Sequence, residues 1–169
     1  MIYYITGGER SGKSRHAQEL AKQLSDSPHY LATSRIWDED FKKRVDRHLA
    51  DRDNSWTTIE EEKYLSKVEI EGKVVVLDCV TLWLTNWFAD SKNDLNLCLQ
   101  SCKDELDQIF QNAQNTNLII ISNEIGMGLH AQTEVGRKFT ELQGWINQYI
   151  AQKADKAIFM VSGLPLQLK

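Results

Sequence analysis

The 169-residue chain contains only two prolines, no Gly/Ser-rich linker, no internal repeat and no long apolar run. Without a linker there is no segment at which two domains would be joined, and the length is that of one ordinary domain. We therefore expect residues 1–169 to form a single domain. No apolar stretch approaches the 18 or so residues that a membrane-spanning helix needs, so no transmembrane segment is expected.

Basic residues are also not in excess, because the chain has 20 Lys and Arg but 24 Asp and Glu, which gives a net charge of −4. This balance argues against general binding of nucleic acid or of anionic membranes, although it allows a local basic pocket for a phosphorylated ligand. The N-terminus has neither the basic nor the apolar region of a signal peptide. The three cysteines, Cys79, Cys98 and Cys102, form no CxxC pair, and Cys98 and Cys102 have the spacing of a packing pair on a helix. Reduced thiols in a cytoplasmic protein are the expectation.

Strand-like apolar runs alternate along the chain with helical patterns. The runs that predict strands are 2–5, 29–32, 74–77, 118–121 and 158–161, and apolar residues recur at helical spacing over 95–109 and 135–149. Continuous Val and Ile runs indicate strands covered on both faces, and the alternation indicates parallel crossovers. The sequence predicts an α/β fold with an open, mainly parallel sheet of about five strands flanked by helices. A short extra strand is expected near 56–59, and the charged stretch 37–67 is either an excursion over the ligand-binding edge or a solvated helix.

The first motif that carries chemistry is GGERSGKS, which follows the first predicted strand and precedes a predicted helix. It matches the G-x-x-x-x-G-K-[ST] phosphate loop, and its members are Gly7, Gly8, Glu9, Arg10, Ser11, Gly12, Lys13 and Ser14. Glycines allow successive backbone N–H groups to turn inward, and the N-terminus of the following helix adds partial positive charge. Lys13 is expected to reach the β- and γ-phosphates, and Ser14 to ligate Mg²⁺. The motif predicts a site for a nucleoside triphosphate.

Two further segments follow predicted strands and therefore end at the same sheet edge. Asp78 closes the run VVVLD, where phosphate-loop proteins hold Mg²⁺, although it could instead cap the helix expected from Val80. The turn 122–128, SNEIGMG, places Glu124 at this edge, where ligands of parallel sheets bind. Glu124 could act as a base or orient water, or Asn123 or Glu124 could cap the next segment.

None of the four histidines is marked as a catalyst by its spacing alone. His48 differs from the others because Arg44, Arg47 and Arg52 surround it in the sequence, which would depress its pKa and keep the imidazole neutral and nucleophilic. The same stretch also fits a solvated charged helix in which aspartates balance the arginines. Trp83 and Trp87, four residues apart, indicate a helix buried in the core or against another subunit.

Taken together, these motifs resemble the bifunctional adenosylcobinamide kinase/adenosylcobinamide-phosphate guanylyltransferases of cobalamin assembly. The resemblance covers essentially the whole chain and includes TGGxRSGKSRHA from Thr6, RxxxHxxxR from Arg44, DCxTLWLTN from Asp78, SNEIGxG from Ser122 and SGLP from Ser162. It implies a RecA-like phosphate-loop domain, a homotrimer, and two reactions. In the first, the terminal hydroxyl of adenosylcobinamide takes the γ-phosphate of ATP or GTP. In the second, a histidine displaces pyrophosphate from GTP and passes GMP to adenosylcobinamide phosphate.

The resemblance also assigns residues to these reactions. His48 stands at the position of the guanylylated histidine, and Lys13 and Mg²⁺ neutralise the departing phosphates. The implied nucleotide contacts are residues 7–14, Ala32, Thr33, Ser34, Leu49, Ala50, Asp51, Arg52, Glu60 and Asp78. Three departures from the family pattern occur at Glu9, Asp53 and His130-Ala131, and the Glu9 side chain is expected to point away from the phosphates.

Two other functional classes remain as alternatives to the bifunctional enzyme. One is an enzyme with a single activity, either a small-molecule kinase or a guanylyltransferase. The other is a phosphate-loop switch or assembly ATPase, but a GTP-specific switch would carry an N/T-K-x-D motif that the sequence lacks.

Overall fold

The computed structural model describes residues 1–36 and 53–169. In this part of the chain the strands are β1 (Ile2–Gly7), β2 (His29–Ala32), β3 (Thr57–Glu60), β4 (Val74–Asp78), β5 (Asn117–Ile121), β6 (Lys156–Val161) and β7 (Leu164–Gln167). The α-helices are α1 (Lys13–Leu24), α3 (Val80–Asp90), α4 (Leu95–Asn112) and α5 (Glu134–Lys153). Two 3₁₀ turns, η1 (Leu65–Lys67) and η2 (Ile125–Met127), complete the described elements.

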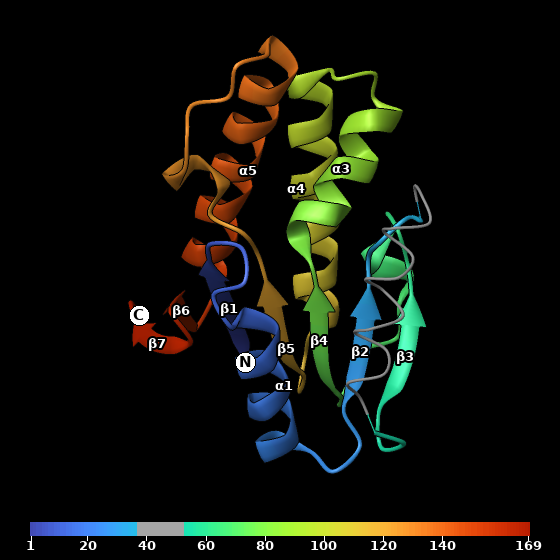
Figure 1. The fold of residues 1–169 in the computed structure, drawn as a ribbon. Coiled ribbons are helices and arrows are strands. Elements are labelled where there is room, and N and C mark those ends of the chain that lie inside the picture. The colour runs from blue at the N-terminus through green and yellow to red at the C-terminus, as the bar shows by residue number, and fades with distance from the viewer. Residues whose placement is uncertain (37–52) are drawn as a thin grey trace.

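All seven strands form one sheet in the order β3-β2-β4-β5-β1-β6-β7. Every neighbouring pair is parallel except β6 and β7, which form an antiparallel hairpin at one edge. The arrowheads in Figure 1 show that the parallel strands end at one edge of the sheet. Each turn that follows a parallel strand therefore reaches that edge.

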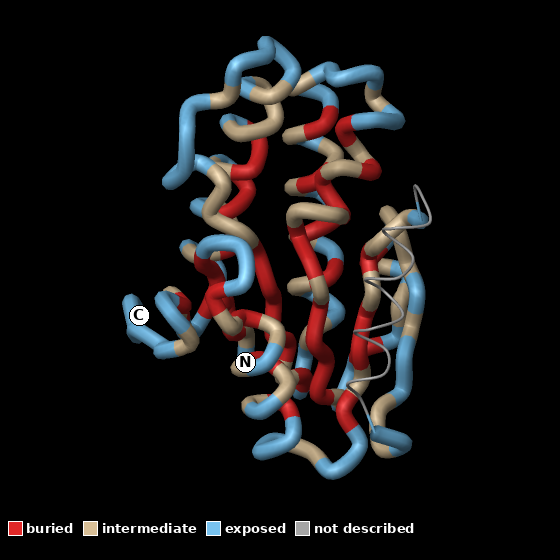
Figure 2. The backbone as a smooth tube through the Cα atoms, viewed as in Figure 1, coloured by how far each residue is buried: buried red, intermediate tan, exposed pale blue. Residues whose placement is uncertain are grey.

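Helices cover the sheet on both faces, as alternation of side chains along buried strands requires. On one face Tyr3, Ile5, Val76 and Ile119 pack with α1. Their sequence neighbours point to the other face and join α3, α4 and α5 in the larger core cluster. Figure 2 shows the resulting buried layer running through the central strands.

The prediction of a mainly parallel α/β fold is confirmed, including the short extra strand, which is β3 and pairs with β2. The predicted helices are present and slightly longer than the periodicity indicated. The strand β7 was not predicted, because all four of its residues are exposed and show no buried pattern. The Ser162-Gly163 turn that joins it to β6 has positive φ at both residues (50° and 82°), as tight hairpins require.

The described helices also bear on three narrower predictions. None of them is long and apolar enough to cross a membrane. The cysteines of α4 form a packing pair, since Cys98 and Cys102 are fully buried with their Sγ atoms 3.9 Å apart. Trp83 is also fully buried within the chain's own core, so α3 needs no second subunit to cover this side chain.

Candidate nucleotide-binding site

The loop between β1 and α1 is shaped by two glycines that no other residue could replace without strain. Gly7 has φ 152°, and a Cβ there would lie 2.5 Å from the Met160 carbonyl oxygen. Gly12 has φ 98° and immediately precedes α1. Both values belong to the left-handed half of backbone space that favours glycine. The glycines that define the sequence motif are therefore required by the backbone.

The β6–β7 hairpin supports this loop from the side. The Gly163 N–H donates to the Ser11 carbonyl oxygen over 2.9 Å, and a Cβ on Gly12 would lie 3.1 Å from the Gly163 Cα. The supporting turn was not assigned a role from the sequence. Its Ser-Gly pair before an apolar segment is the signal that could have predicted a hairpin there.

Inside the loop, two polar groups fit a phosphate ligand. Lys13 is buried, and its Nζ donates to the Gly8 carbonyl oxygen over 2.6 Å. Burial lowers the pKa of Lys13, while the charges of Asp78 and Glu9 oppose the shift. The Ser11 Oγ is buried without a hydrogen-bond partner among the described residues. An unsatisfied buried hydroxyl is costly, and a phosphate oxygen would satisfy it.

Asp78 and Ser14 meet at the mouth of the loop. The Ser14 Oγ donates to Asp78 Oδ2 over 3.0 Å, and the Tyr30 hydroxyl donates to the same oxygen over 2.6 Å. Asp78 does not cap α3, because the N-cap position is Cys79. The Asp78–Cys79 peptide bond is cis.

The oxygen donors of Ser14 and Asp78 suit a hard cation such as Mg²⁺. No group of three or more His, Cys, Asp or Glu side chains in the described segments forms an all-protein metal cage. Mg²⁺ is commonly held by one or two side chains together with substrate phosphates and water, and Ser14 and Asp78 are candidates for those side chains.

The strand register places other predicted residues along the same edge. Glu60, Ala32 and Asp78 are paired across β3, β2 and β4, so the three strand ends form one row. Glu60 is exposed at this row. Thr33, which follows β2, is fully buried, and its hydroxyl donates to the Cys79 carbonyl oxygen over 2.8 Å. The Thr33 side chain therefore joins two strand ends, and Ser34 beside it is half-buried.

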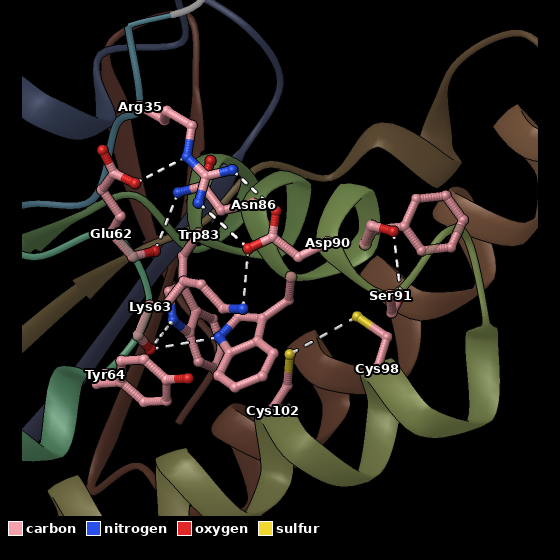
Figure 3. Close-up of polar contacts among 12 residues, drawn as sticks. Arg35, Glu62, Lys63, Tyr64, Trp83, Asn86, Asp90, Ser91, Cys98 and Cys102 are labelled. Carbon is pink, nitrogen blue, oxygen red and sulfur yellow. Dashed lines mark hydrogen bonds and ion pairs between the residues drawn. The ribbon is translucent and has the colours of Figure 1, made fainter.

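Asn86 of α3 holds the chain segments that follow β2 and β3. Its Nδ2 donates to the Thr33 carbonyl oxygen over 2.8 Å and to the Glu62 carbonyl oxygen over 3.0 Å. Figure 3 shows this amide among charged side chains from these segments and from α3 itself. The segments that follow β2 and β3, which form the rim of the site, are thus held by α3.

The charged cluster around Asn86 comprises Arg35, Glu62, Lys63 and Asp90 (Figure 3). Arg35 pairs with Glu62 over 2.7 Å and with Asp90 over 3.0 Å, and Lys63 reaches Asp90 over 2.9 Å. Hydrogen bonds from Arg35 and Lys63 hold the pKa of Asp90 below its usual range. Lys63 also lies 4.2 Å from the centre of the Trp87 ring, which adds a cation–π contact.

Glu9 and Arg10 are exposed on the phosphate loop. The charge of Glu9 acts on Lys13, and the direction of its side chain relative to bound phosphates stays a prediction. The predicted nucleophile His48 and the predicted contacts Leu49, Ala50, Asp51 and Arg52 lie outside the described residues.

Glu124 lies at the same edge of the sheet, and the sequence allowed several roles for it. It precedes η2 without a side-chain cap, so the capping alternative does not apply to it. Asn123 likewise does not cap η2, and its Nδ2 donates to the Thr81 Oγ1 over 3.1 Å.

Comparison with solved structures supports the fold. An ATPase of the type III secretion system of pathogenic bacteria matches with a TM-score of 0.52 at 12% identity, over 98% of this chain and 56% of that one. At this identity the likeness concerns only the fold, which is that of phosphate-loop NTPases.

Comparison with protein families and curated proteins identifies the relatives. The family model described as cobinamide kinase/cobinamide phosphate guanyltransferase matches residues 3–168. The bifunctional adenosylcobalamin biosynthesis protein CobP of Pseudomonas aeruginosa is 36% identical, over 98% of this chain and 95% of that protein. The bifunctional adenosylcobalamin biosynthesis protein CobU of Escherichia coli K12 is 32% identical over the full length of both chains. The chain therefore belongs to the cobinamide kinase/cobinamide phosphate guanyltransferase family.

Proposed function

We propose that residues 1–169 act as one domain that phosphorylates adenosylcobinamide and then transfers GMP from GTP to the product, which gives adenosylcobinamide-GDP. The observation that carries this proposal is the 3.0 Å contact between Ser14 and Asp78 at the mouth of a complete phosphate loop. Family membership supplies the two reactions. A purely structural strand–helix turn would have no need of the buried Lys13 or the unpartnered Ser11 hydroxyl.

The phosphate loop serves both reactions by binding the triphosphate. We expect backbone N–H groups of the loop and the N-terminus of α1 to bind the phosphates, as in other loops of this type. The Lys13 ammonium exchanges the Gly8 carbonyl oxygen for the β- and γ-phosphates. Charge that develops on the departing phosphate is stabilised there, which is most of what phosphoryl transfer requires from a protein.

Ser14 and Asp78 are the residues that would hold Mg²⁺. The ion would supply positive charge that neutralises the phosphates of the nucleotide. The Tyr30 hydroxyl orients the Asp78 carboxylate by a 2.6 Å hydrogen bond, so the second carboxylate oxygen remains for the ion or its water.

The second reaction uses His48 as the nucleophile. A neutral imidazole nitrogen attacks the α-phosphorus of GTP, the bond to the β-phosphate oxygen breaks, and pyrophosphate leaves with its electron pair. An oxygen of adenosylcobinamide phosphate then attacks the same phosphorus and releases the histidine. We assign nucleotide contacts to the loop 7–14, to the rim residues Ala32, Thr33, Ser34 and Glu60, and to Leu49, Ala50, Asp51 and Arg52.

Assembly and compartment belong to the same proposal. We propose a homotrimer, as the family resemblance implies, and the exposed apolar side chains of the β6–β7 hairpin offer it a surface: Val161, Leu164, Leu166 and Leu168. A cytoplasmic location is consistent with three cysteines that are all free thiols.

The guanylyl step is tested by incubating the protein with GTP and Mg²⁺ and measuring its intact mass. We expect a covalent GMP adduct that is acid-labile and absent from His48→Ala. His130→Ala is the matched control, because His130 is exposed and has no assigned role, and this variant should form the adduct normally. Absence of an adduct in the wild-type protein under turnover conditions would overturn the assignment of His48.

The kinase step needs its own assay, which is phosphorylation of adenosylcobinamide with ATP or GTP followed by mass spectrometry. A protein that passes only one of the two assays would have a single activity. A protein that hydrolyses nucleotide but passes neither assay would instead fit the switch or assembly ATPase alternative.

A further inference from the structure

Glu124 lies at the carboxyl edge of the sheet, directly beside the start of the phosphate loop. It follows β5, which lies between β4 with Asp78 and β1 with the loop. Its backbone N–H donates to the Gly7 carbonyl oxygen over 3.1 Å. Lys13, which is expected to bind the terminal phosphates, contacts the next residue, Gly8. Glu124 and Lys13 are therefore both held at the first residues of the loop.

One oxygen of the Glu124 carboxylate is held by three donors. Oε1 accepts from the Thr6 hydroxyl over 2.7 Å, from the Asn147 amide over 3.0 Å and from the Tyr4 hydroxyl over 3.3 Å. Burial raises the pKa of Tyr4 far above its usual range, so its phenol remains protonated and donates. The second oxygen, Oε2, receives no hydrogen bond from the described residues. The carboxylate is thus fixed at one oxygen and available at the other.

The donor Asn147 is itself held in one orientation. Its Oδ1 accepts from the Ser122 hydroxyl over 2.6 Å and from the Gln143 amide over 2.9 Å. Its Nδ2 donates to the Asn123 carbonyl oxygen as well as to Glu124, both over 3.0 Å. Each amide hydrogen and the amide oxygen are engaged, so the side chain cannot flip without losing several hydrogen bonds.

This polar network is energetically less favourable than apolar side chains at the same positions would be. Ser122, Gln143 and Asn147 are buried polar side chains, which are unfavourable in a core unless their hydrogen bonds are satisfied. Apolar residues would pack α5 against β5 without that requirement. What the polar residues add is the fixed position of a single carboxylate, a second layer of contacts typical of groups that touch substrate.

We propose that Glu124 is the general base of the kinase reaction. Its Oε2 accepts the proton of the substrate's terminal hydroxyl while that oxygen forms a bond to the γ-phosphorus. The bond from the γ-phosphorus to the bridging oxygen breaks, and its electron pair leaves on the nucleoside diphosphate, next to Lys13. The proton on Glu124 is then released to solvent. The guanylyl step needs no such base, since a neutral imidazole has a free electron pair and the phosphorylated substrate attacks as an anion.

This inference rests on the proposed function, and the two reactions provide its test. Glu124→Gln preserves shape and keeps an oxygen acceptor for Thr6, Tyr4 and Asn147 but removes the base. We expect kcat for phosphorylation of adenosylcobinamide to fall about 10²- to 10⁴-fold, the range for loss of a general base. The KM for the nucleotide and the rate of covalent GMP formation should change by less than about threefold. Glu141→Gln, an exposed change of equal charge on α5, is the matched control and should leave both reactions unaltered.

Glu124→Asp extends the test, because it keeps the base but withdraws it by one methylene. We expect its kcat to fall between those of the wild type and Glu124→Gln. Equal loss of the kinase reaction and adduct formation in Glu124→Gln would overturn the assignment, since Glu124 would then serve the nucleotide site or the fold. A kinase rate within about threefold of wild type would also overturn it. A wild-type protein that forms the adduct but does not phosphorylate adenosylcobinamide would remove the kinase half of the proposed function itself.

Discussion

Truncation of Asn86 to alanine should weaken both the fold and the rim of the nucleotide site. The Asn86 amide donates to two backbone carbonyl oxygens, those of Thr33 and Glu62, which belong to segments that follow neighbouring strands. Thr33 is fully buried, so its carbonyl oxygen would lose its donor with little access to water, at a cost of about 1–3 kcal/mol. The Glu62 contact is only partly buried, and water can replace part of it, which reduces that cost to about 1 kcal/mol.

One offsetting gain arises because the Asn86 Oδ1 is buried without a partner among the described residues. Removing this unsatisfied acceptor returns about 1 kcal/mol. The net expectation is a fall of about 2–3 kcal/mol in the free energy of unfolding, including a small cavity at the helix face. Urea denaturation measures this change as a lower midpoint with an unchanged slope.

Thr85→Ala on the same helix is the matched control. Among the described residues, the Thr85 hydroxyl bonds only to the Thr81 carbonyl oxygen within α3, and alanine has the higher helix propensity. The free energy of unfolding should therefore change by less than about 0.5 kcal/mol. The nucleotide KM should rise in Asn86→Ala and not in Thr85→Ala. Equal stability of the two variants would refute the inference that the hydrogen bonds of Asn86 hold the segments after β2 and β3.

Three further predictions concern other parts of the molecule. Asp78→Asn should lower both activities at least 10²-fold and raise the Mg²⁺ concentration needed for half-maximal rate, and an unchanged Mg²⁺ titration would contradict its role with Ser14. The three buried thiols (Cys79, Cys98 and Cys102) should resist iodoacetamide at pH 8 until the protein is unfolded, as mass spectrometry would show, and burial raises the pKa of Cys79 to about 12. Hydrogen bonds from Ser55 and Lys22 lower the pKa of Asp53 to about 2. The free energy that these contacts contribute to folding should thus be complete above about pH 4 and be lost as the pH falls toward 2. An NMR titration of the Asp53 carboxyl would give its pKa. The Asp53→Asn variant should lack this part of the pH dependence of stability.

Most of the fold could be predicted because its strands are buried on both faces. Runs such as VVVLD and LIII leave few alternatives to a parallel sheet, and helices 95–112 and 134–153 bury one face at the expected spacing. The hairpin strand β7 could not be found in this way, since an exposed edge strand is stabilised by backbone hydrogen bonds that leave no hydrophobic pattern. Its contribution to the site, the support of Gly12 by Gly163, depends on a contact between backbones 151 residues apart.

The site could be predicted to the extent that each residue stands next to a local motif. Lys13, Ser14 and Asp78 follow directly from strand ends and the loop signature, and the structure brings Ser14 and Asp78 into contact. The supporting residues Tyr30 and Asn86 could not be recognised, because a hydroxyl in a strand and an amide in an apolar helix have no partner within their own segments. Only the folded sheet reveals that Tyr30 faces Asp78 and that Asn86 joins two strand ends.

The order of the strands explains how one loop can serve two reactions at different phosphorus atoms. Asp78 ends β4, which has β5, followed by Glu124, on one side and β2 and β3 on the other. His48 lies in the sequence between β2 and β3, which are the two strands on the side of β4 away from β5. The two proposed reactions take place at opposite ends of a triphosphate, one at the γ-phosphorus and the other at the α-phosphorus. The proposed base Glu124 and the proposed nucleophile His48 therefore belong to chain segments on opposite sides of Asp78 in the strand order. The separation predicted for Glu124→Gln and His48→Ala, in which each variant loses a different reaction, is the kinetic consequence of that arrangement.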